Sequence, residues 1–293
     1  LTAMGNSRTS FIATGIGLVL NIVLDPLFIF GFGVIHPMGV AGAAIATVLA
    51  QLVVMLLFLY TILRDTVLFC DVHILHSYSS QHTREIFRIG LPSAVQSMLF
   101  SGISMVIARL IAGWGDAAVA VQKVGSQIES ISWMTAEGYA AALNSFVAQN
   151  HGAKNTDRIR EGYRLSMIVM LSWGVFCSFV LIVFPQLIFQ VFIQEAEVLP
   201  MGVDYLRILG VSQLFMCMEI TTAGAFSGLG KTLPPSIVSI TLTGARIPMA
   251  ILLGRWLGLN GVWWAITISS IGKGIVLLGW FLKDMKRAGM PER

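Results

Sequence analysis

Three oxygen-bearing side chains fall where two neighbouring helices can bring them together. Asn21 and Asp25 are four residues apart, on one face of a helix, and Thr47 belongs to the next apolar stretch. A carboxylate, an amide and a hydroxyl that converge suit a hard monovalent cation or a relayed proton. We therefore expect Asn21, Asp25 and Thr47 to couple to Na⁺ or H⁺. In the alternative, Asp25, directly before Pro26, only caps and kinks its helix.

A second group of ionisable residues lies further along the chain, inside apolar stretches. An ionisable side chain at mid-membrane costs between about 2.5 and more than 10 kcal/mol, so each should face a partner or a watery cavity. Glu129 and Glu219 are predicted as further coupling groups, because burial favours a neutral carboxyl and a nearby cation favours a charged one. Static ion pairs that only fix helix register are the alternative. The remaining members are predicted to form ion pairs in a cavity: Lys123, Glu137, Arg246 and Lys273.

The other reactive residue types do not indicate catalysis, a resident cofactor or a metal beyond Na⁺. All five histidines lie outside the apolar stretches, where no intramembrane enzyme could use them. The three cysteines are widely spaced and form no CxxC pair. The GLGKT segment at 228–232 resembles a phosphate-binding loop, but Ala225 stands at the position of the required first glycine. We therefore expect neither an enzyme nor a nucleotide-binding protein.

Membrane helices must hold these residues in place. The chain is 56% hydrophobic and 12% charged, with a mean hydropathy of +0.79, which excludes a water-soluble surface. Apolar stretches long enough to cross a ~30 Å hydrocarbon core must be helices, because no water is there to satisfy the backbone. The predicted fold is all-α and polytopic, with eight transmembrane helices near 10–31, 41–63, 91–113, 117–149, 165–193, 200–229, 233–254 and 259–282.

Basic residues predict the orientation. Most of the 19 lysines and arginines fall in loops on one side, so we expect a multi-pass inner-membrane protein with both chain ends cytoplasmic. The basic balance then encodes topology rather than nucleic-acid binding. Residues 64–90 are predicted to be a cytoplasmic linker, 151–164 a short basic amphipathic helix at the same face, and 285–293 a cytoplasmic tail.

An internal repeat divides the chain. The segment from Gly5 can be aligned with that from Gly230 at an offset of 225 residues, and GVAG from Gly39 with GLNG from Gly258 at an offset of 219. We expect two parallel six-helix lobes, related by a pseudo-two-fold axis along the membrane normal. Residues 1–63 would be the last two helices of the first lobe, and 91–284 a complete second lobe. On this alignment four helices are expected to precede Leu1, so the chain is expected to be truncated at its N-terminus.

Successive motifs resemble the MATE (multidrug and toxic compound extrusion) transporters. They are NIVLDPLFIFG (21–31), GVAGAAIATVLAQ (39–51), RIGLPSAVQSM (88–98), QIESISWMTAEGYAAALNSFVAQNHGAKN (127–155) and TTAGAFSGLGKT (221–232). The resemblance implies twelve helices in two lobes that open alternately and exchange Na⁺ or H⁺ for organic, often cationic, compounds. It also implies that Asn21, Asp25 and Thr47 share their site with an aspartate of the first helix. One MATE branch places acids on the first and fourth helices of the second lobe, yet 91–113 has none.

The function expected is therefore a secondary antiporter that exports organic, cationic or drug-like compounds in exchange for H⁺ or Na⁺. Its expected partners are a small organic substrate and membrane lipid, with no nucleic acid, and a monomer is expected. A flippase for a lipid-linked oligosaccharide or a related lipid-linked precursor is the alternative, since it also uses two helical bundles. Such a flippase is expected to have a more basic cavity than three bases balanced by three acids.

Overall fold

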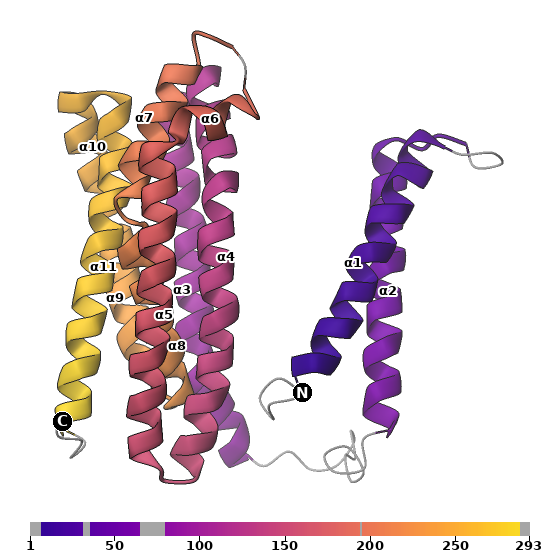
Figure 1. The fold of residues 1–293 in the computed structure, drawn as a ribbon, viewed down its shortest axis with the longest axis vertical. Helices are drawn as coiled ribbons and strands as arrows, with labels where there is room; N and C mark the ends of the chain where they lie inside the picture. Colours follow the sequence, from indigo (N-terminus) through magenta and orange to yellow (C-terminus); the bar gives the residue numbers. More distant parts are fainter. Residues whose placement is uncertain (1–6, 32–35, 65–79, 194, 288–293) are drawn as a thin grey trace. The chain divides into compact units, whose positions relative to one another are not determined.

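The computed structural model describes residues 7–31, 36–64, 80–193 and 195–287, and over these residues all regular structure is helical (Figure 1). The chain divides into two compact units, 1–79 and 80–293, which are described separately.

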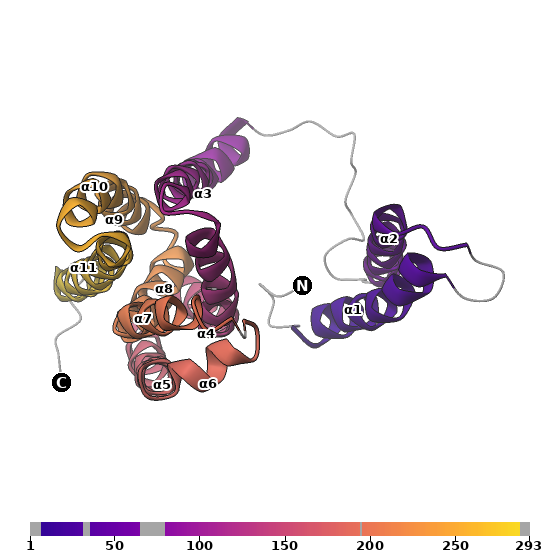
Figure 2. The ribbon, with the colours of Figure 1, turned by 90° about the horizontal axis from the view of Figure 1, so that it is seen from above.

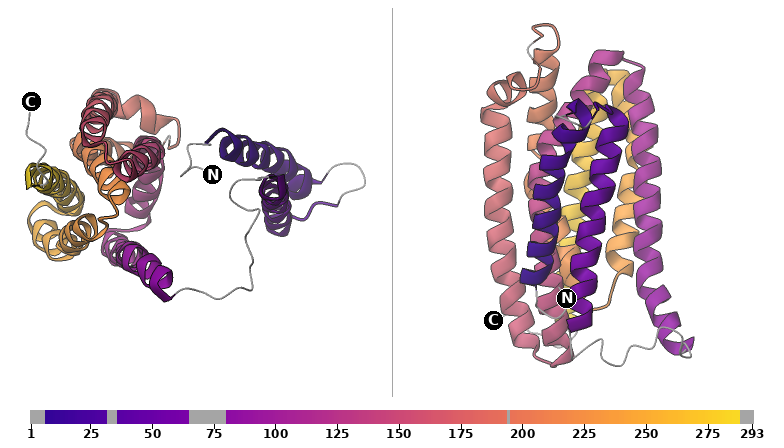
Figure 3. Two further views of the ribbon diagram at one scale, coloured as in Figure 1. Left: turned by 90° about the horizontal axis from the view of Figure 1, so that it is seen from below. Right: turned by 90° about the vertical axis from the view of Figure 1, so that its right-hand side faces the viewer.

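The first unit is a hairpin of two helices, α1 (Ser7–Phe30) and α2 (Val40–Arg64), which lie side by side (Figure 3). The two backbones approach closely at one end, where a side chain at Gly42 would overlap the backbone of Phe28. Ala46 and Ala50 continue the buried face of α2 at helical spacing. Small residues at i, i+4 and i+8 allow this close packing, as is usual between membrane helices.

Pro26 lies inside α1, which continues to Phe30. Asp25 is therefore an interior residue of the helix and does not cap either of its ends. A carboxylate in this position keeps its oxygens available to neighbouring side chains rather than to the free backbone N–H groups of a helix end.

The second unit is a bundle in which α8 occupies the middle (Figure 2). Its helices in chain order are α3 (Ser80–Ala112), α4 (Asp116–Gly152), α5 (Thr156–Val183), α6 (Pro185–Gln190), α7 (Leu199–Gly210), α8 (Gln213–Gly228), α9 (Leu233–Gly244), α10 (Arg246–Leu257) and α11 (Leu259–Arg287). Helix α8 packs against α4, α5 and α11, while α3 packs against α9 and α10.

Two glycines of α8 allow its close contact with α4. A side chain at Gly224 would meet the backbone of Ala140, and one at Gly228 would meet the backbone of Asn144. This GxxxG spacing puts both glycines on one face of α8, where only a hydrogen atom fits between the backbones. Further along the same pair of helices, Glu129 of α4 lies within hydrogen-bond distance of Gln213 of α8.

The observed helices differ from several of the predicted membrane spans in where they begin, end or break. The stretch at 165–193 ends as a helix at Val183, because Pro185 has no N–H to continue it and starts the short helix α6. The stretch at 200–229 is two helices bent by 46°. Helix α3 begins at Ser80, earlier than the predicted 91.

The predicted short amphipathic helix at 151–164 is wrong. Helix α4 runs to Gly152, and Lys154 has a positive φ of 56° in the turn that follows. Asn155 then caps α5 by accepting a hydrogen bond from the backbone N–H of Arg158. The basic residues 158–164 therefore form the first turns of a long membrane helix.

Six of the described helical segments are long and apolar enough to cross a membrane, and the bent pair α7–α8 would make a seventh. Helix α4 is not among them, although it is the longest helix at 37 residues. The fold is thus a polytopic helical membrane protein, as the composition predicted.

Both halves of the predicted repeat show the same local geometry. Gly39 and Gly258, which the alignment pairs, both have positive φ, 55° and 63°, directly before α2 and α11. Gly42 and Gly261 are paired by the same offset, and each is pressed against the backbone of the preceding helix, at Phe28 and Leu253. Phe28 and Leu253 are themselves paired at the offset of 225. The aligned positions therefore make equivalent contacts in the two hairpins.

Candidate functional site

In the first unit the structure brings Asn21, Asp25 and Thr47 together. The amide nitrogen of Asn21 donates to Oδ1 of Asp25 at 3.3 Å and to the hydroxyl oxygen of Thr47 at 3.5 Å. The Thr47 hydroxyl donates to the carbonyl of Ala43 at 2.9 Å, which orients its lone pairs away from its own helix. The predicted convergence of the three side chains is confirmed as geometry.

This cluster offers oxygens to a cation or a proton. Asn21 and Asp25 are half-buried and Thr47 is exposed within the unit. The second carboxylate oxygen of Asp25 and the carbonyl oxygen of Asn21 are not used in the contacts above. A carboxylate, an amide carbonyl and a hydroxyl are the ligand types that hard cations select.

In the second unit Glu129 of α4 is held by two helices. Its Oε1 accepts a 2.6 Å hydrogen bond from the amide of Gln213, the first residue of α8, and its Oε2 accepts one of 3.3 Å from the hydroxyl of Tyr205 on α7. Glu129 thus contacts both arms of the 46° bend. Any change in the charge of Glu129 alters hydrogen bonds on both sides of this break.

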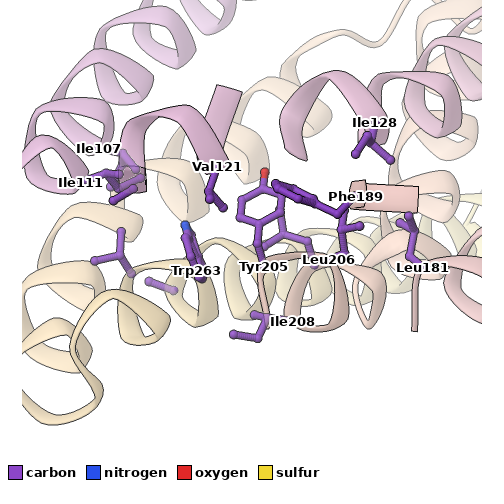
Figure 4. Close-up of a cluster of buried hydrophobic side chains, with 14 of the residues drawn as sticks. Ile107, Ile111, Val121, Ile128, Leu181, Phe189, Tyr205, Leu206, Ile208 and Trp263 are labelled. Atoms are coloured by element: carbon purple, nitrogen blue, oxygen red, sulfur yellow. The ribbon is translucent and has the colours of Figure 1, made fainter. Parts of the chain in front are cut away.

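Tyr205 is placed by packing. It is fully buried, its ring lies over Gly125, and it meets Trp263 edge to face with centroids 5.1 Å apart. Gln122 links the two, because its amide lies 3.5 Å from the Tyr205 hydroxyl and its carbonyl accepts from the Trp263 indole at 3.0 Å. Figure 4 shows the Tyr205 hydroxyl and the Trp263 nitrogen among apolar side chains. The polar chain therefore runs through the hydrophobic core.

Lys273 and Glu219 form a buried ion pair between α11 and α8. Their charged groups are 2.9 Å apart, and their side chains are 8% and 13% exposed. Both lie within helices that are predicted to span the membrane. Each charge lowers the cost of burying the other.

Among the described residues, no carboxylate forms an ion pair with Arg246. Its Nε donates to the hydroxyl of Ser269 at 2.5 Å and its Nη2 to that of Ser270 at 3.0 Å, both on α11. Lys123 and Glu137 are exposed on α4, and neither forms an ion pair with another described residue. Of the four residues predicted for cavity ion pairs, the structure pairs only Lys273 with an acid.

The sequence reasoning missed the uncharged members of these clusters. Tyr205, Gln213 and Gln122 around Glu129, and Ser269 and Ser270 around Arg246, carry no formal charge. Their signal was a polar side chain inside an apolar span, which is costly in lipid unless it is hydrogen-bonded. Within the described residues, no group of three His, Cys, Asp or Glu side chains suits a metal ion.

Known proteins resemble this chain over nearly its whole length. A probable multidrug resistance protein, NorM of Thermotoga maritima, is 32% identical over 98% of this chain and 63% of its own length. An FAD transporter of Shewanella oneidensis is 24% identical over 94% of this chain and 61% of its own length. The chain thus spans less than two thirds of these relatives.

Solved structures with a similar fold are also MATE proteins. A crystal structure of a MATE protein in its bent conformation superposes with a TM-score of 0.84 at 26% identity, covering 97% of this chain and 63% of the other. Residues 92–252 match the MatE family model. Matches of sequence, of fold and of the family model agree, and the chain belongs to the MATE family of transporters.

Proposed function

We propose that the protein containing this chain is a secondary antiporter that exports organic, drug-like compounds in exchange for H⁺ or Na⁺. The observation that carries the proposal is the convergence of Asn21, Asp25 and Thr47 across α1 and α2. A half-buried carboxylate in an apolar hairpin is costly, and such residues mark ion pathways and proton relays in membrane proteins. Export of drug-like compounds is supported by the name of the Thermotoga maritima relative.

Glu129 and Glu219 are proposed as the coupling groups of the second unit. Glu129 touches both α7 and α8 at their bend, so its charge would bias the angle between them. Glu219 is held by Lys273, which would release it only when a competing cation or proton arrives. Lys123 and Glu137 are proposed to face the aqueous passage, because they are exposed charges on a helix of a membrane bundle.

The arrangement proposed is two lobes, with α1 and α2 the end of the first and α3 to α11 the second. Helix α4 would be the eighth crossing here, since its 37 residues exceed the ~20 needed to span the hydrocarbon core. Matching glycine geometry in the two hairpins supports a parallel repeat. Alternating access of the lobes would then expose the substrate to each side in turn.

The setting proposed is a monomer in the inner membrane with both ends cytoplasmic, contacting lipid and a small organic substrate. Only H⁺ or Na⁺ would be required, with no resident cofactor and no nucleic acid. The flippase alternative is not carried forward, because the relatives are named for the transport of drugs and of FAD.

Dye efflux tests the proposal. The full-length protein and its Asp25→Asn, Glu129→Gln and Glu219→Gln variants would be expressed in cells that are loaded with ethidium, and H⁺ or Na⁺ gradients would then be imposed. We expect gradient-driven efflux from the parent and a loss of about tenfold or more in at least Asp25→Asn. Unchanged gradient-driven efflux in all three variants refutes the assignment of the site, and no efflux from the parent refutes the function.

A further inference from the structure

Arg246 is a buried cation that no acid neutralises by contact. It lies near the middle of the apolar segment Leu233–Leu257 and is 9% exposed. Both of its hydrogen-bond partners, Ser269 and Ser270, are neutral hydroxyls. Among the described residues, no carboxylate is close enough to form an ion pair with it. Arginine keeps its charge even when buried, so this arrangement is costly unless an anion visits it.

The acids of the same interior are engaged elsewhere. Glu219 is held by Lys273 at 2.9 Å, and Glu129 accepts from Gln213 and Tyr205. Lys273 is one turn beyond Ser269 and Ser270 on α11, and its charge is already paired with Glu219. Glu129 and Glu219 attract the charge of Arg246 only at longer range, so the N–H groups of Arg246 have no carboxylate acceptor among the described residues.

The donors that remain have the geometry of an oxyanion site. A guanidinium has five N–H groups, and the two serines account for two of them. A carboxylate or phosphate can accept two of the remaining bonds in parallel. Thr243, one turn before Arg246, is buried, and its hydroxyl has no hydrogen-bond partner in the described part of the chain. This unpartnered buried hydroxyl adds a further polar group to the same segment of the chain.

The repeat places this cation where the first unit has its candidate cation site. At the offset of 225, Arg246 corresponds to Asn21, and Ala250 stands where Asp25 stands. In each hairpin the side chain at this position reaches a hydroxyl on the following helix. At these two aligned positions, the second unit thus has a guanidinium where the first has an amide, and a methyl group where the first has a carboxylate. The second unit therefore carries a positive charge where the first unit has its candidate cation site, and a positive charge attracts an anion.

An aromatic ring adjoins the guanidinium. Phe100 of α3 lies 6.0 Å from the guanidinium carbon of Arg246, and its side chain is exposed. A flat organic body can lie against such a ring while its charged group reaches the arginine.

We propose that Arg246, with Ser269 and Ser270, binds the carboxylate or phosphate of a small organic molecule inside the second unit. This inference rests on the proposed function, since it adds anionic and zwitterionic compounds to the substrates of the same transporter. A lipid phosphate has the same chemistry, and the experiment separates the two sources.

Binding of two radiolabelled probes to the full-length protein tests the site. The protein would be placed in phosphatidylcholine nanodiscs and titrated with p-aminohippurate, an aromatic carboxylate, and with tetraphenylphosphonium, an aromatic cation. We expect Arg246→Gln to weaken p-aminohippurate binding by about tenfold or more, because a charge-assisted pair is lost. Arg246→Lys should restore only part of it, because an ammonium lacks the planar fork. Lys231→Gln, which removes an exposed lysine whose partner is Asp284, is the matched control and should bind as the parent does.

Each outcome bears on the proposal. Parent-like p-aminohippurate binding by Arg246→Gln, or no binding by the parent, overturns it. Tighter p-aminohippurate binding by the parent in lipid-free dodecyl maltoside than in the nanodiscs, with the gain absent in Arg246→Gln, supports the oxyanion site and assigns it to a lipid phosphate. Tetraphenylphosphonium binding and ethidium efflux report separately on the proposed function, and they can persist when the anion site fails.

A structural measurement covers the case in which Arg246→Gln does not fold. Crystals of the parent protein soaked with 4-iodobenzoate would locate the iodine by its anomalous signal. We expect the carboxylate within hydrogen-bond distance of Arg246. Iodine found only at other places contradicts the proposal without any variant.

Discussion

The ammonium of Lys273 on α11 lies 2.9 Å from the carboxylate of Glu219 on α8, with both side chains nearly enclosed. A second lysine–acid pair, Lys231 with Asp284, is closer at 2.6 Å but is 49% and 29% exposed. The two pairs differ chiefly in burial, so they allow its effect to be measured within one protein.

Replacement of one partner of the buried pair should be strongly destabilising. We expect Lys273→Met to cost about 3–5 kcal/mol, because it leaves Glu219 without its counter-charge. Lys231→Met should cost at most about 1 kcal/mol, because water already screens that pair. Thermal unfolding of the detergent-solubilised protein compares them, and equal losses for both variants would contradict a role for burial.

Packing beneath Tyr205 gives a second prediction. A methyl group at Gly125 would overlap the Tyr205 ring, whereas nothing lies within 4 Å of a side chain added at Gly138 on the same helix. Gly125→Ala should therefore destabilise the protein by about 1–3 kcal/mol and move the Tyr205 hydroxyl away from Glu129. Gly138→Ala should be neutral or stabilise by up to about 1 kcal/mol, since alanine favours a helix. Melting temperatures in detergent measure both, and a tolerated Gly125→Ala would show that the ring is not packed as described.

Charge and hydropathy predicted the parts of the fold that depend on solvent. The helices around Asn21 and Thr47 followed from apolar length, and the grouping of Asn21 with Asp25 followed from helical spacing. Such features need no knowledge of distant contacts, because the bilayer imposes them on each segment alone.

Contacts between distant segments could not be predicted in this way. Gln213 donates a hydrogen bond to Glu129, and Arg246 donates to Ser269 and Ser270 rather than to an acid. Both arrangements depend on which helix faces pack together. The 46° bend between α7 and α8 was missed, although Gly210 ends α7 and Ser212 precedes α8. Glycine and serine together are a usual place for a helix to bend, but glycines are so frequent in these apolar stretches that this one did not stand out.

The equivalent glycine contacts of the two hairpins give a third prediction. Gly42→Ala and Gly261→Ala should each destabilise by about 1–3 kcal/mol, because each new methyl group would press on a neighbouring backbone that cannot rotate away. Gly15→Ala and Gly279→Ala, where a side chain would meet nothing within 4 Å, serve as controls. Thermal melts of the four variants should separate them into these two pairs. Tolerance of either Gly42→Ala or Gly261→Ala would argue against the matched packing.

Thr47 provides a fourth prediction about the cation site. Thr47→Ala removes one oxygen of the cluster and should weaken Na⁺ binding, or proton-driven efflux, by about two- to tenfold. Thr61, on the same helix, likewise donates to the carbonyl four residues earlier, but among the described residues it forms no hydrogen bond with Asn21 or Asp25. Thr61→Ala should therefore leave coupling unchanged. Titration with ²²Na⁺ and dye efflux at varied pH measure the two variants, and equal effects would assign Thr47 to helix packing alone.

Exchange itself is tested most directly by counting the ions that a bound substrate displaces. Purified full-length protein in a weakly buffered detergent solution would be equilibrated with ²²Na⁺ or at a fixed pH, and tetraphenylphosphonium would then be added. We expect release of ²²Na⁺ or of protons in proportion to the substrate bound, and no release from the combined Asp25→Asn, Glu129→Gln, Glu219→Gln variant. Substrate binding without release of either ion from the parent protein would contradict the account.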